Sequence, residues 1–360
     1  MSDCLIIGGG IIGMLTALEL AHAGFKVSII ERGNVGQESS WAGGGILSPL
    51  YPWRHPTAIT ALSQWSQANY PEFFRQIIQK TDIDPEYVGN GLLILDTEEY
   101  LQAKAWAEQY HVALERLSGA SIYDCEPELG DFKEAFWLPM VGQVRNPRLM
   151  KTLRKALDIA KVTLLEHHQV KSLEVLDAHN IGIHTENHGF LAAKRVVIAA
   201  GAWSSRLLNT INIPLNVNPI RGQMILFSAQ PGLVSRIILS NEHYIIPRRD
   251  GCVLAGSTLE QTGFKKETTE RALQNLKYSA ITFVPRLADY RIIHHWAGLR
   301  PSSPNGIPYI CQHPTIPSLY INTGHFRNGV VLGLASARLM SDIILERSPI
   351  LDPTPYQLPD

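Results

Sequence analysis

The sequence predicts an α/β protein in which a Rossmann-like domain is interrupted by a second domain built on a mixed, largely antiparallel sheet. Three observations support this fold class. Residues 4–31 have the pattern of a strand, a glycine-rich turn, a helix and a second strand. Residues 216–296 consist mainly of short strand-like runs, with one helical stretch near 268–279. Residues 319–346 return to a strand and a helix, so we expect the first domain to be assembled from separated segments.

The first segment carries the spacing Gly8-x-Gly10-x-x-Gly13 between an apolar run and an apolar-periodic helix. Gly8 permits a tight turn, Gly10 lets the backbone approach a pyrophosphate, and Gly13 lets the helix pack closely against the strand. The first helical residues, Ile11 and Ile12, present unpaired N–H groups at the positive end of the helix dipole. This pattern predicts a site for the phosphates of a dinucleotide.

Glu31 ends the second strand, eighteen residues after Gly13, and Arg32 follows it. A carboxylate at this position accepts hydrogen bonds from the ribose hydroxyls of an adenosine and repels a 2′-phosphate, which argues against NADP. The glycine spacing alone also occurs in ordinary turns. Strand, helix and acid together predict a dinucleotide site, but they leave open which dinucleotide binds.

Composition describes an ordinary globular protein with a small ligand. A chain of 360 residues with 45% hydrophobic and 18% charged residues can form two domains. The net charge of −1 provides no field that would attract nucleic acid or anionic lipid. The four cysteines are widely spaced, so we expect neither a disulfide framework nor a metal site. No apolar run reaches the ~20 residues of a membrane span, and no basic residue precedes the apolar N-terminus, so we expect a soluble, cytoplasmic protein.

A loop rich in glycine and serine follows the first βαβ unit. Ser39 and Ser40 can donate hydrogen bonds to a phosphate, and the run 43–45 of three glycines allows close approach of a large flat ligand. A flexible connection is the alternative interpretation. The next segment, residues 49–56, contains three prolines and two aromatic residues, and its sequence fits a lid and a stiff loop equally well.

The middle of the chain alternates between helical and strand patterns. Helices are expected at 57–80, 97–110 and 148–160, strands at 91–95 and 162–165, a turn into a short element at 123–129, and alternating segments near 171–193. His167 and His168 would point to opposite faces of a strand, so we interpret them as surface residues and not as a metal pair.

Two later stretches have the character of a cofactor site. The β-branched run 194–198 ends in small residues at Ala200 and Gly201 before Trp203, which leaves room for a cofactor at the carboxyl edge of a parallel sheet. A buried parallel strand is expected there in either case. Another strand ends at Gly324, and the polar loop after it opens a helix over 330–346, which is favourable for an anion.

Taken together, these stretches resemble the flavin-dependent amine and amino-acid oxidases of the D-amino-acid oxidase type. Within that group the chain is most similar to the bacterial glycine oxidases of thiazole (thiamine) synthesis. The resemblance covers essentially all residues, and its markers are the Gly8–Gly13 fingerprint with Glu31 and the segments 39–45, 199–203, 244–248, 297–301 and 324–329.

The resemblance implies a glutathione-reductase-like FAD-binding domain with an inserted substrate domain. We expect the FAD-binding domain to comprise residues 1–85, 141–215 and 297–360, and the substrate domain residues 86–140 and 216–296. FAD is expected to be bound non-covalently, with its adenine near the backbone of Val170. The residues expected to contact it are Gly8, Gly10, Ile11, Ile12, Gly13, Glu31, Arg32, Ser39, Ser40, Ala42, Gly43, Gly44, Gly45, Ile46, Leu47, Val170, Ala200, Gly201, Trp203, His325, Phe326, Arg327, Asn328, Gly329 and Val330.

The resemblance also assigns three residues to the substrate. Arg300 is expected to bind the carboxylate of an amino acid, because a planar guanidinium can form two parallel hydrogen bonds with it. Tyr244 would add a hydroxyl contact to the same carboxylate, and Arg327 would line the pocket beside the flavin. The alternatives are that Arg300 caps a strand beside Pro301 and that Arg327 pairs with an acid.

The implied reaction is oxidative deamination of glycine and other small amino acids. A hydride passes from Cα to flavin N5, the imine hydrolyses to glyoxylate and ammonia, and O2 reoxidises the flavin to give H2O2. Oxidation or dehydrogenation of sarcosine or a D-amino acid is the main alternative. A tRNA-modifying oxidase module is disfavoured by the balanced charge. The expected partners are therefore a small amino acid and O2, without nucleic acid or membrane, and a homo-oligomeric state is left open.

We predict that acid or heat denaturation releases FAD from the purified protein. Some relatives tether FAD through a cysteine, but the matching segment 296–300 contains none, and Cys311 lies too far along the chain. The measurement is the flavin absorbance of the supernatant after the denatured chain has been removed. Yellow colour that stays with the precipitate would contradict non-covalent binding.

Overall fold

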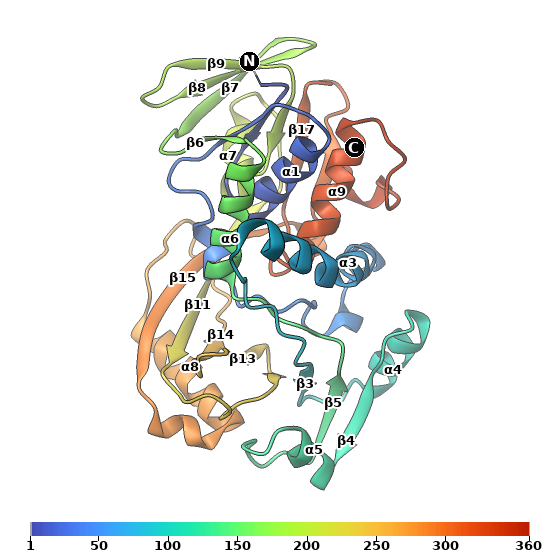
Figure 1. Ribbon diagram of the computed structural model, residues 1–360, viewed down its shortest axis with the longest axis vertical. Helices are drawn as coiled ribbons and strands as arrows, with labels where there is room; N and C mark the ends of the chain where they lie inside the picture. The colour runs from blue at the N-terminus through green and yellow to red at the C-terminus, as the bar shows by residue number, and fades with distance from the viewer. Residues whose placement is uncertain (1, 360) are drawn as a thin grey trace.

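The computed structural model describes residues 2–359, and Figure 1 shows an elongated molecule with one domain at each end of its long axis. Within these residues the upper domain contains a six-stranded sheet with the order β16-β17-β10-β1-β2-β6. Its strands are β16 (Tyr309–Gln312), β17 (Leu319–Thr323), β10 (Val196–Ile198), β1 (Cys4–Ile7), β2 (Val27–Ile30) and β6 (Thr163–Leu165). All neighbours pair in parallel except β16 and β17. This is the Rossmann-like sheet that the βαβ pattern predicts.

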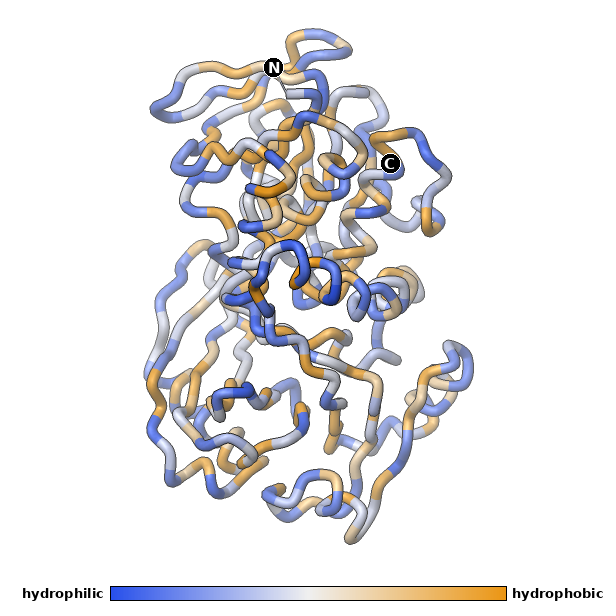
Figure 2. The backbone as a smooth tube through the Cα atoms, in the orientation of Figure 1, coloured by the Kyte–Doolittle hydropathy of each residue, from blue (hydrophilic) through white to orange (hydrophobic). Residues whose placement is uncertain are grey.

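Helices cover one face of this sheet and a small sheet covers the other. The helices are α1 (Ile11–His22), α3 (Thr57–Thr81), α6 (Asn146–Ile159) and α9 (Gly333–Ile344). The side chains of Ile6 and Ile29 pack toward them, whereas Ile7 and Ile30 pack toward the opposite core. That core is closed by α7 (Ser204–Asn209) and by the strands β7 (Val170–Asp177), β8 (Asn180–Thr185) and β9 (Phe190–Ala193). In Figure 2 hydrophobic segments accordingly concentrate at the centre of the upper half.

The lower domain is built on an eight-stranded sheet with the order β15-β11-β14-β13-β12-β3-β5-β4. The strands are β15 (Ile292–Ser302), β11 (Asn218–Phe227), β14 (Val253–Gly256), β13 (His243–Pro247), β12 (Ile237–Ser240), β3 (Leu92–Ile94), β5 (Glu134–Leu138) and β4 (Glu115–Ser118). Only β12 and β3 are parallel neighbours, which confirms the mixed, largely antiparallel sheet. The helix α8 (Glu270–Phe283) packs on one face through residues such as Leu276. The domain boundary expected between 296 and 297 falls inside β15, which pairs with β11 along its length.

Most predicted elements are present with shifted ends. The helix expected at 97–110 is α4 (Tyr100–Gln109), and the turn expected at 123–129 overlaps the short helix α5 (Ala120–Cys125). His167 and His168 were expected on a strand, but they lie in the loop between β6 and β7, where the positive φ of 60° at His167 is incompatible with a strand. None of the helices within residues 2–359 combines the length and apolar character that a membrane crossing requires.

Candidate active site

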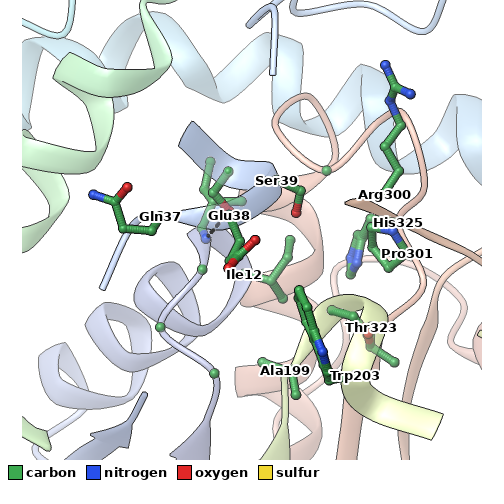
Figure 3. Close-up of a pocket in the computed structure, with 18 of the residues that line it drawn as sticks. Ile12, Gln37, Glu38, Ser39, Ala199, Trp203, Arg300, Pro301, Thr323 and His325 are labelled. Carbon is green, nitrogen blue, oxygen red and sulfur yellow. Dashed lines mark hydrogen bonds between the residues drawn. The ribbon is translucent and has the colours of Figure 1, made fainter. Parts of the chain in front are cut away.

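A cavity of about 440 Å³ opens at the carboxyl ends of β1, β2, β10 and β17, the edge at which open α/β sheets bind ligands. Its walls also include the N-terminus of α1 and residues of β13 and β15 from the lower domain. In the close-up of Figure 3, Gln37 and Arg300 mark opposite sides of the pocket. The cavity therefore lies where the two domains meet.

The glycines at the start of α1 have three different roles. Gly8 adopts a φ of +115°, and a Cβ there would lie 2.3 Å from the carbonyl oxygen of Ala199. Gly8 and Gly10 line the cavity, whereas Gly13 does not. A Cβ on Gly13 would lie 2.0 Å from the carbonyl oxygen of Gly8, so this residue is needed for helix packing. Gly13 therefore has the packing role assigned to it, and it is not part of the cavity wall at which the cofactor was expected to contact it.

Glu31 is held at the edge of the cavity by the backbone. Its carboxylate accepts hydrogen bonds from the N–H groups of Gly9 at 2.8 Å and Gly33 at 3.0 Å. Each oxygen keeps a second lone pair, so the carboxylate can still accept from ribose hydroxyls. Arg32 forms an ion pair with Glu38 at 2.7 Å, and its guanidinium lies 3.6 Å from the ring centroid of Trp203.

The glycine- and serine-rich loop includes the short helix α2 (Glu38–Ala42). The Ser40 hydroxyl accepts a hydrogen bond from the N–H of Ile11 at 2.9 Å, so it caps the start of α1. Gly45 has a φ of +80°, and a Cβ there would lie 2.0 Å from the carbonyl oxygen of Val144. Arg248 donates to the carbonyl oxygen of Gly44 at 2.8 Å. The loop is thus fixed from both domains.

Two residues expected to contact the cofactor lie behind this loop. Ala42 does not line the cavity, and its carbonyl oxygen accepts a hydrogen bond from Trp296 Nε1 at 3.1 Å. Leu47 is buried in the helical core, and its N–H donates to the carbonyl oxygen of Gly142 at 2.9 Å. Both positions support the loop without lining the cavity, whereas their neighbours Ser40 and Ile46 do line it.

The loop before α9 faces the same cavity. Gly324 and Phe326 both have positive φ, +87° and 46°, which turns the chain between β17 and α9. Within residues 2–359, the N–H groups of Gly329 and Val330 have no hydrogen-bond acceptor. These free donors in the turn before α9 can stabilise negative charge on a bound ligand.

His325 is buried beside this loop and bonds Ser336 Oγ through Nε2 at 2.9 Å. Burial lowers the pKa of the His325 imidazole to about 3. The ring is therefore neutral at physiological pH, because no acidic partner offsets the loss of hydration. It lines the cavity as a fixed, uncharged group.

The three residues expected at the substrate lie on the wall of this one cavity. Arg300 on β15 donates to the carbonyl oxygen of Thr258 at 3.0 Å and to Ser257 Oγ at 2.7 Å. Its guanidinium lies on Gly222, where a Cβ would be only 2.0 Å from Nη1. Burial, with a further contribution from the charge of Arg327, lowers the pKa of Arg300. No acidic side chain within residues 2–359 forms an ion pair with Arg300, so its charge is not neutralised by the protein.

Arg327 and Tyr244 complete this part of the wall. One nitrogen of Arg327 pairs with Glu242, as the alternative interpretation expected, and the same side chain lines the cavity. Its Nη2 is buried and has no hydrogen-bond partner within residues 2–359. The buried ring of Tyr244 contacts the glycine run, with its hydroxyl 3.4 Å from the Cβ position of Gly44. Two guanidinium groups and a phenol are thus available to an anionic ligand.

Sequence reasoning missed several wall residues. The cavity is also lined by Gly9, Asn34, Gln37, Glu38, Ser48, Leu50, His168, Gln169, Lys171, Arg206, Asn322 and Thr323. Gln37 and Glu38 lie within the glycine- and serine-rich loop that was predicted to face the ligand, but they were not among the residues expected to contact it. Lys171 and Arg206 carry no local signal, because their place depends on how β7 and α7 pack. Val170, predicted beside the adenine, does line the cavity.

The fold and this site define a flavin-dependent oxidoreductase. The chain belongs to the FAD dependent oxidoreductase (DAO) family, whose model matches residues 3–343. Glycine oxidase from Pseudomonas putida is 45% identical over 354 residues, which cover 98% of this chain and 97% of that protein. The bifunctional protein ThiO/ThiG from Nostoc is 31% identical over 96% of this chain, which corresponds to 53% of its own length. The structure of this chain matches the crystal structure of glycine oxidase from Geobacillus kaustophilus with a TM-score of 0.94 and a sequence identity of 28%. The match covers 99% of this chain and 98% of that one.

The hydrogen-bonding groups on the cavity wall fit FAD. Gly8 and Gly10 lie on the cavity wall beside the free N–H groups of α1, and Glu31 lies where a ribose would bind. The unpaired N–H groups of Gly329 and Val330 suit the electron-accepting ring, which becomes negative on reduction. None of the cysteines within residues 2–359 lines the cavity.

We predict that the buried His325 makes the holoenzyme less stable as the pH falls. Its folded-state pKa of about 3 lies below the ordinary value of 6.5, so between these values the unfolded chain binds a proton that the folded chain excludes. Lowering the pH from 6.5 to about 5.5 should reduce the free energy of unfolding by about 1 kcal/mol through this group. His325→Gln should remove this part of the slope in denaturant titrations, whereas His294→Gln, at an exposed position of β15, should keep it. Equal slopes in the two variants would exclude this role of His325.

Proposed function

We propose that this protein oxidatively deaminates glycine and other small amino acids, with O2 as the electron acceptor and glyoxylate, ammonia and H2O2 as products. The observation that carries the proposal is the guanidinium of Arg300, which lies on the cavity wall without an acidic partner within residues 2–359. A charge withdrawn from water is costly unless it is paired, and a substrate carboxylate would pair it. The glycine oxidase relatives and their full-length similarity support the same substrate class.

Arg300 would bind the carboxylate in one orientation because its own position is fixed. Thr258 and Ser257 each accept one hydrogen bond from it, which leaves the remaining N–H groups of the fork for substrate. Tyr244 would donate its hydroxyl to the same carboxylate. Arg327, held on one side by Glu242, would add positive charge through its buried Nη2. These residues would orient the substrate so that its Cα faces the flavin.

FAD, when bound, supplies the acceptor for the hydride and the reactivity toward O2. The protein then needs to bind a neutral amine and to keep the substrate in place. His325 is uncharged, since burial lowers its pKa to about 3, and it adds no positive charge beside the amine. We also propose a place in thiazole (thiamine) synthesis, which is supported by the resemblance to the glycine oxidases of that process.

Arg300→Lys is expected to reduce kcat/KM for glycine roughly ten- to a hundredfold, because it removes one charge-assisted hydrogen bond of ~1.5 to 3 kcal/mol. FAD content should stay the same, since lysine keeps the positive charge but not the two-pronged geometry. Steady-state assays of H2O2 production and the flavin spectrum measure the two effects. Arg249→Lys, in an exposed ion pair with Asp84, is the matched control and should retain full activity. An unchanged kcat/KM in Arg300→Lys would remove this residue from the substrate site.

Glycine is expected to reduce the flavin faster than sarcosine or D-alanine does. Under anaerobic conditions glycine should bleach the flavin absorbance, and admission of air should restore it with stoichiometric H2O2. The rate should rise with pH toward the pKa of the amine, because only the neutral amine readily releases a hydride from the adjacent carbon. Bleaching by D-alanine but not by glycine, or recovery only with an artificial acceptor, would instead indicate a D-amino-acid oxidase or a dehydrogenase.

A further inference from the structure

The segment from Ser257 to Lys266 connects the lower domain to the nucleotide end of the cofactor cavity. The segment follows β14 and is bound to β11 through Glu260. The N–H of Glu260 donates to the carbonyl oxygen of Arg221 at 3.0 Å, and the N–H of Arg221 donates to the carbonyl oxygen of Glu260 at 2.9 Å. The Glu260 carboxylate also accepts a hydrogen bond from Gln223 Nε2 at 2.7 Å. The base of the segment is therefore fixed on the sheet of the lower domain.

The tip of this segment contacts the upper domain. The ring of Phe264 lies 5.5 Å from that of Trp203, and the guanidinium of Arg206 lies 3.5 Å from the Phe264 centroid. Two residues further on, Lys266 pairs with Glu38 at 2.9 Å. Trp203, Arg206 and Glu38 all line the cavity, whereas Phe264 and Lys266 hold them from outside.

These contacts form a closed ring. Arg32 lies on Trp203 and pairs with Glu38, so two of the three wall residues that meet the segment are also joined to each other. Arg32 directly follows Glu31, the residue expected at the ribose of the cofactor. Opening the nucleotide end of the cavity at this wall therefore requires the ring of contacts to break.

We propose that Phe264 and Lys266 form a clasp that retains FAD by holding the wall beside its nucleotide half. Phe264 carries most of the effect, because it makes an aromatic pair and a cation–π contact. The ion pair between Lys266 and Glu38 contributes less, since both side chains are partly exposed, at 45% and 30%. The clasp acts on the cofactor, so it does not depend on which amine is the substrate.

The test measures FAD binding separately from catalysis. FAD is removed from the purified holoenzyme, and the apoprotein is titrated with FAD while flavin fluorescence is followed. Phe264→Ala should raise the Kd for FAD roughly tenfold and speed its release from the holoenzyme. The kcat for glycine at saturating FAD should stay within about twofold, because Phe264 does not line the cavity. Tyr278→Ala removes an aromatic ring on α8 that is 75% exposed, and it should leave the Kd unchanged.

Two charge-reversal variants, Lys266→Glu and Lys265→Glu, test the proposal independently if Phe264→Ala does not fold. Lys266→Glu should weaken FAD binding by repelling Glu38, whereas Lys265→Glu changes the charge equally one residue away. Equal Kd values in Lys266→Glu and Lys265→Glu, or in Phe264→Ala and Tyr278→Ala, would overturn the clasp. A lower kcat at saturating FAD with an unchanged Kd would also overturn it, because the segment would then act on catalysis and not on retention.

Discussion

The arrangement of the nucleotide half depends on one steric constraint, the close approach of backbone segments at Gly8. A Cβ on Gly8 would lie 2.3 Å from the carbonyl oxygen of Ala199, and a Cβ on Gly13 would lie 2.0 Å from that of Gly8. Only glycine permits both contacts, so β1, β10 and α1 meet without intervening side chains. The N-terminus of α1 then opens directly into the cavity. Ser40 occupies one N–H of its first turn and leaves the next ones for a ligand.

The part of the cavity around Arg300 and Arg327 depends on a different feature, because the protein compensates the positive charges of these two residues only in part. Arg300 is surrounded by a carbonyl, a hydroxyl and a second arginine, and burial lowers its pKa. Neutral acceptors fix the guanidinium in place but do not neutralise it. Arg327 differs, because Glu242 pairs with one of its nitrogens and leaves Nη2 buried without a partner within residues 2–359. A carboxylate ligand would pair with both groups, which is the arrangement proposed above for the substrate.

The sequence predicted those parts of the site that depend on local chain geometry. The turn at Gly8, the acid at Glu31 and the polar loop before α9 each follow a strand, and a strand end determines where they lie. The errors at Ala42 and Leu47 have another origin. Their segment was recognised, but whether a residue faces the cavity or the core depends on contacts with Trp296 and Gln67, far away in the sequence. Thr258 was missed because it reaches Arg300 only through the pairing of β14, β11 and β15, and Phe264 because the packing of the two domains places it beside Trp203.

The segment that carries Thr258 and Phe264 connects the part of the cavity at Arg300 with the nucleotide end of the cavity. Its first residues hold the guanidinium of Arg300, and its tip holds the wall beside Glu31, with a fixed bridge to β11 at Glu260 between them. Arg300 and the wall residue Trp203 therefore contact the same segment of the lower domain. In the function proposed above, the meeting of the domains, and not either sheet by itself, would determine how substrate and cofactor are held relative to each other.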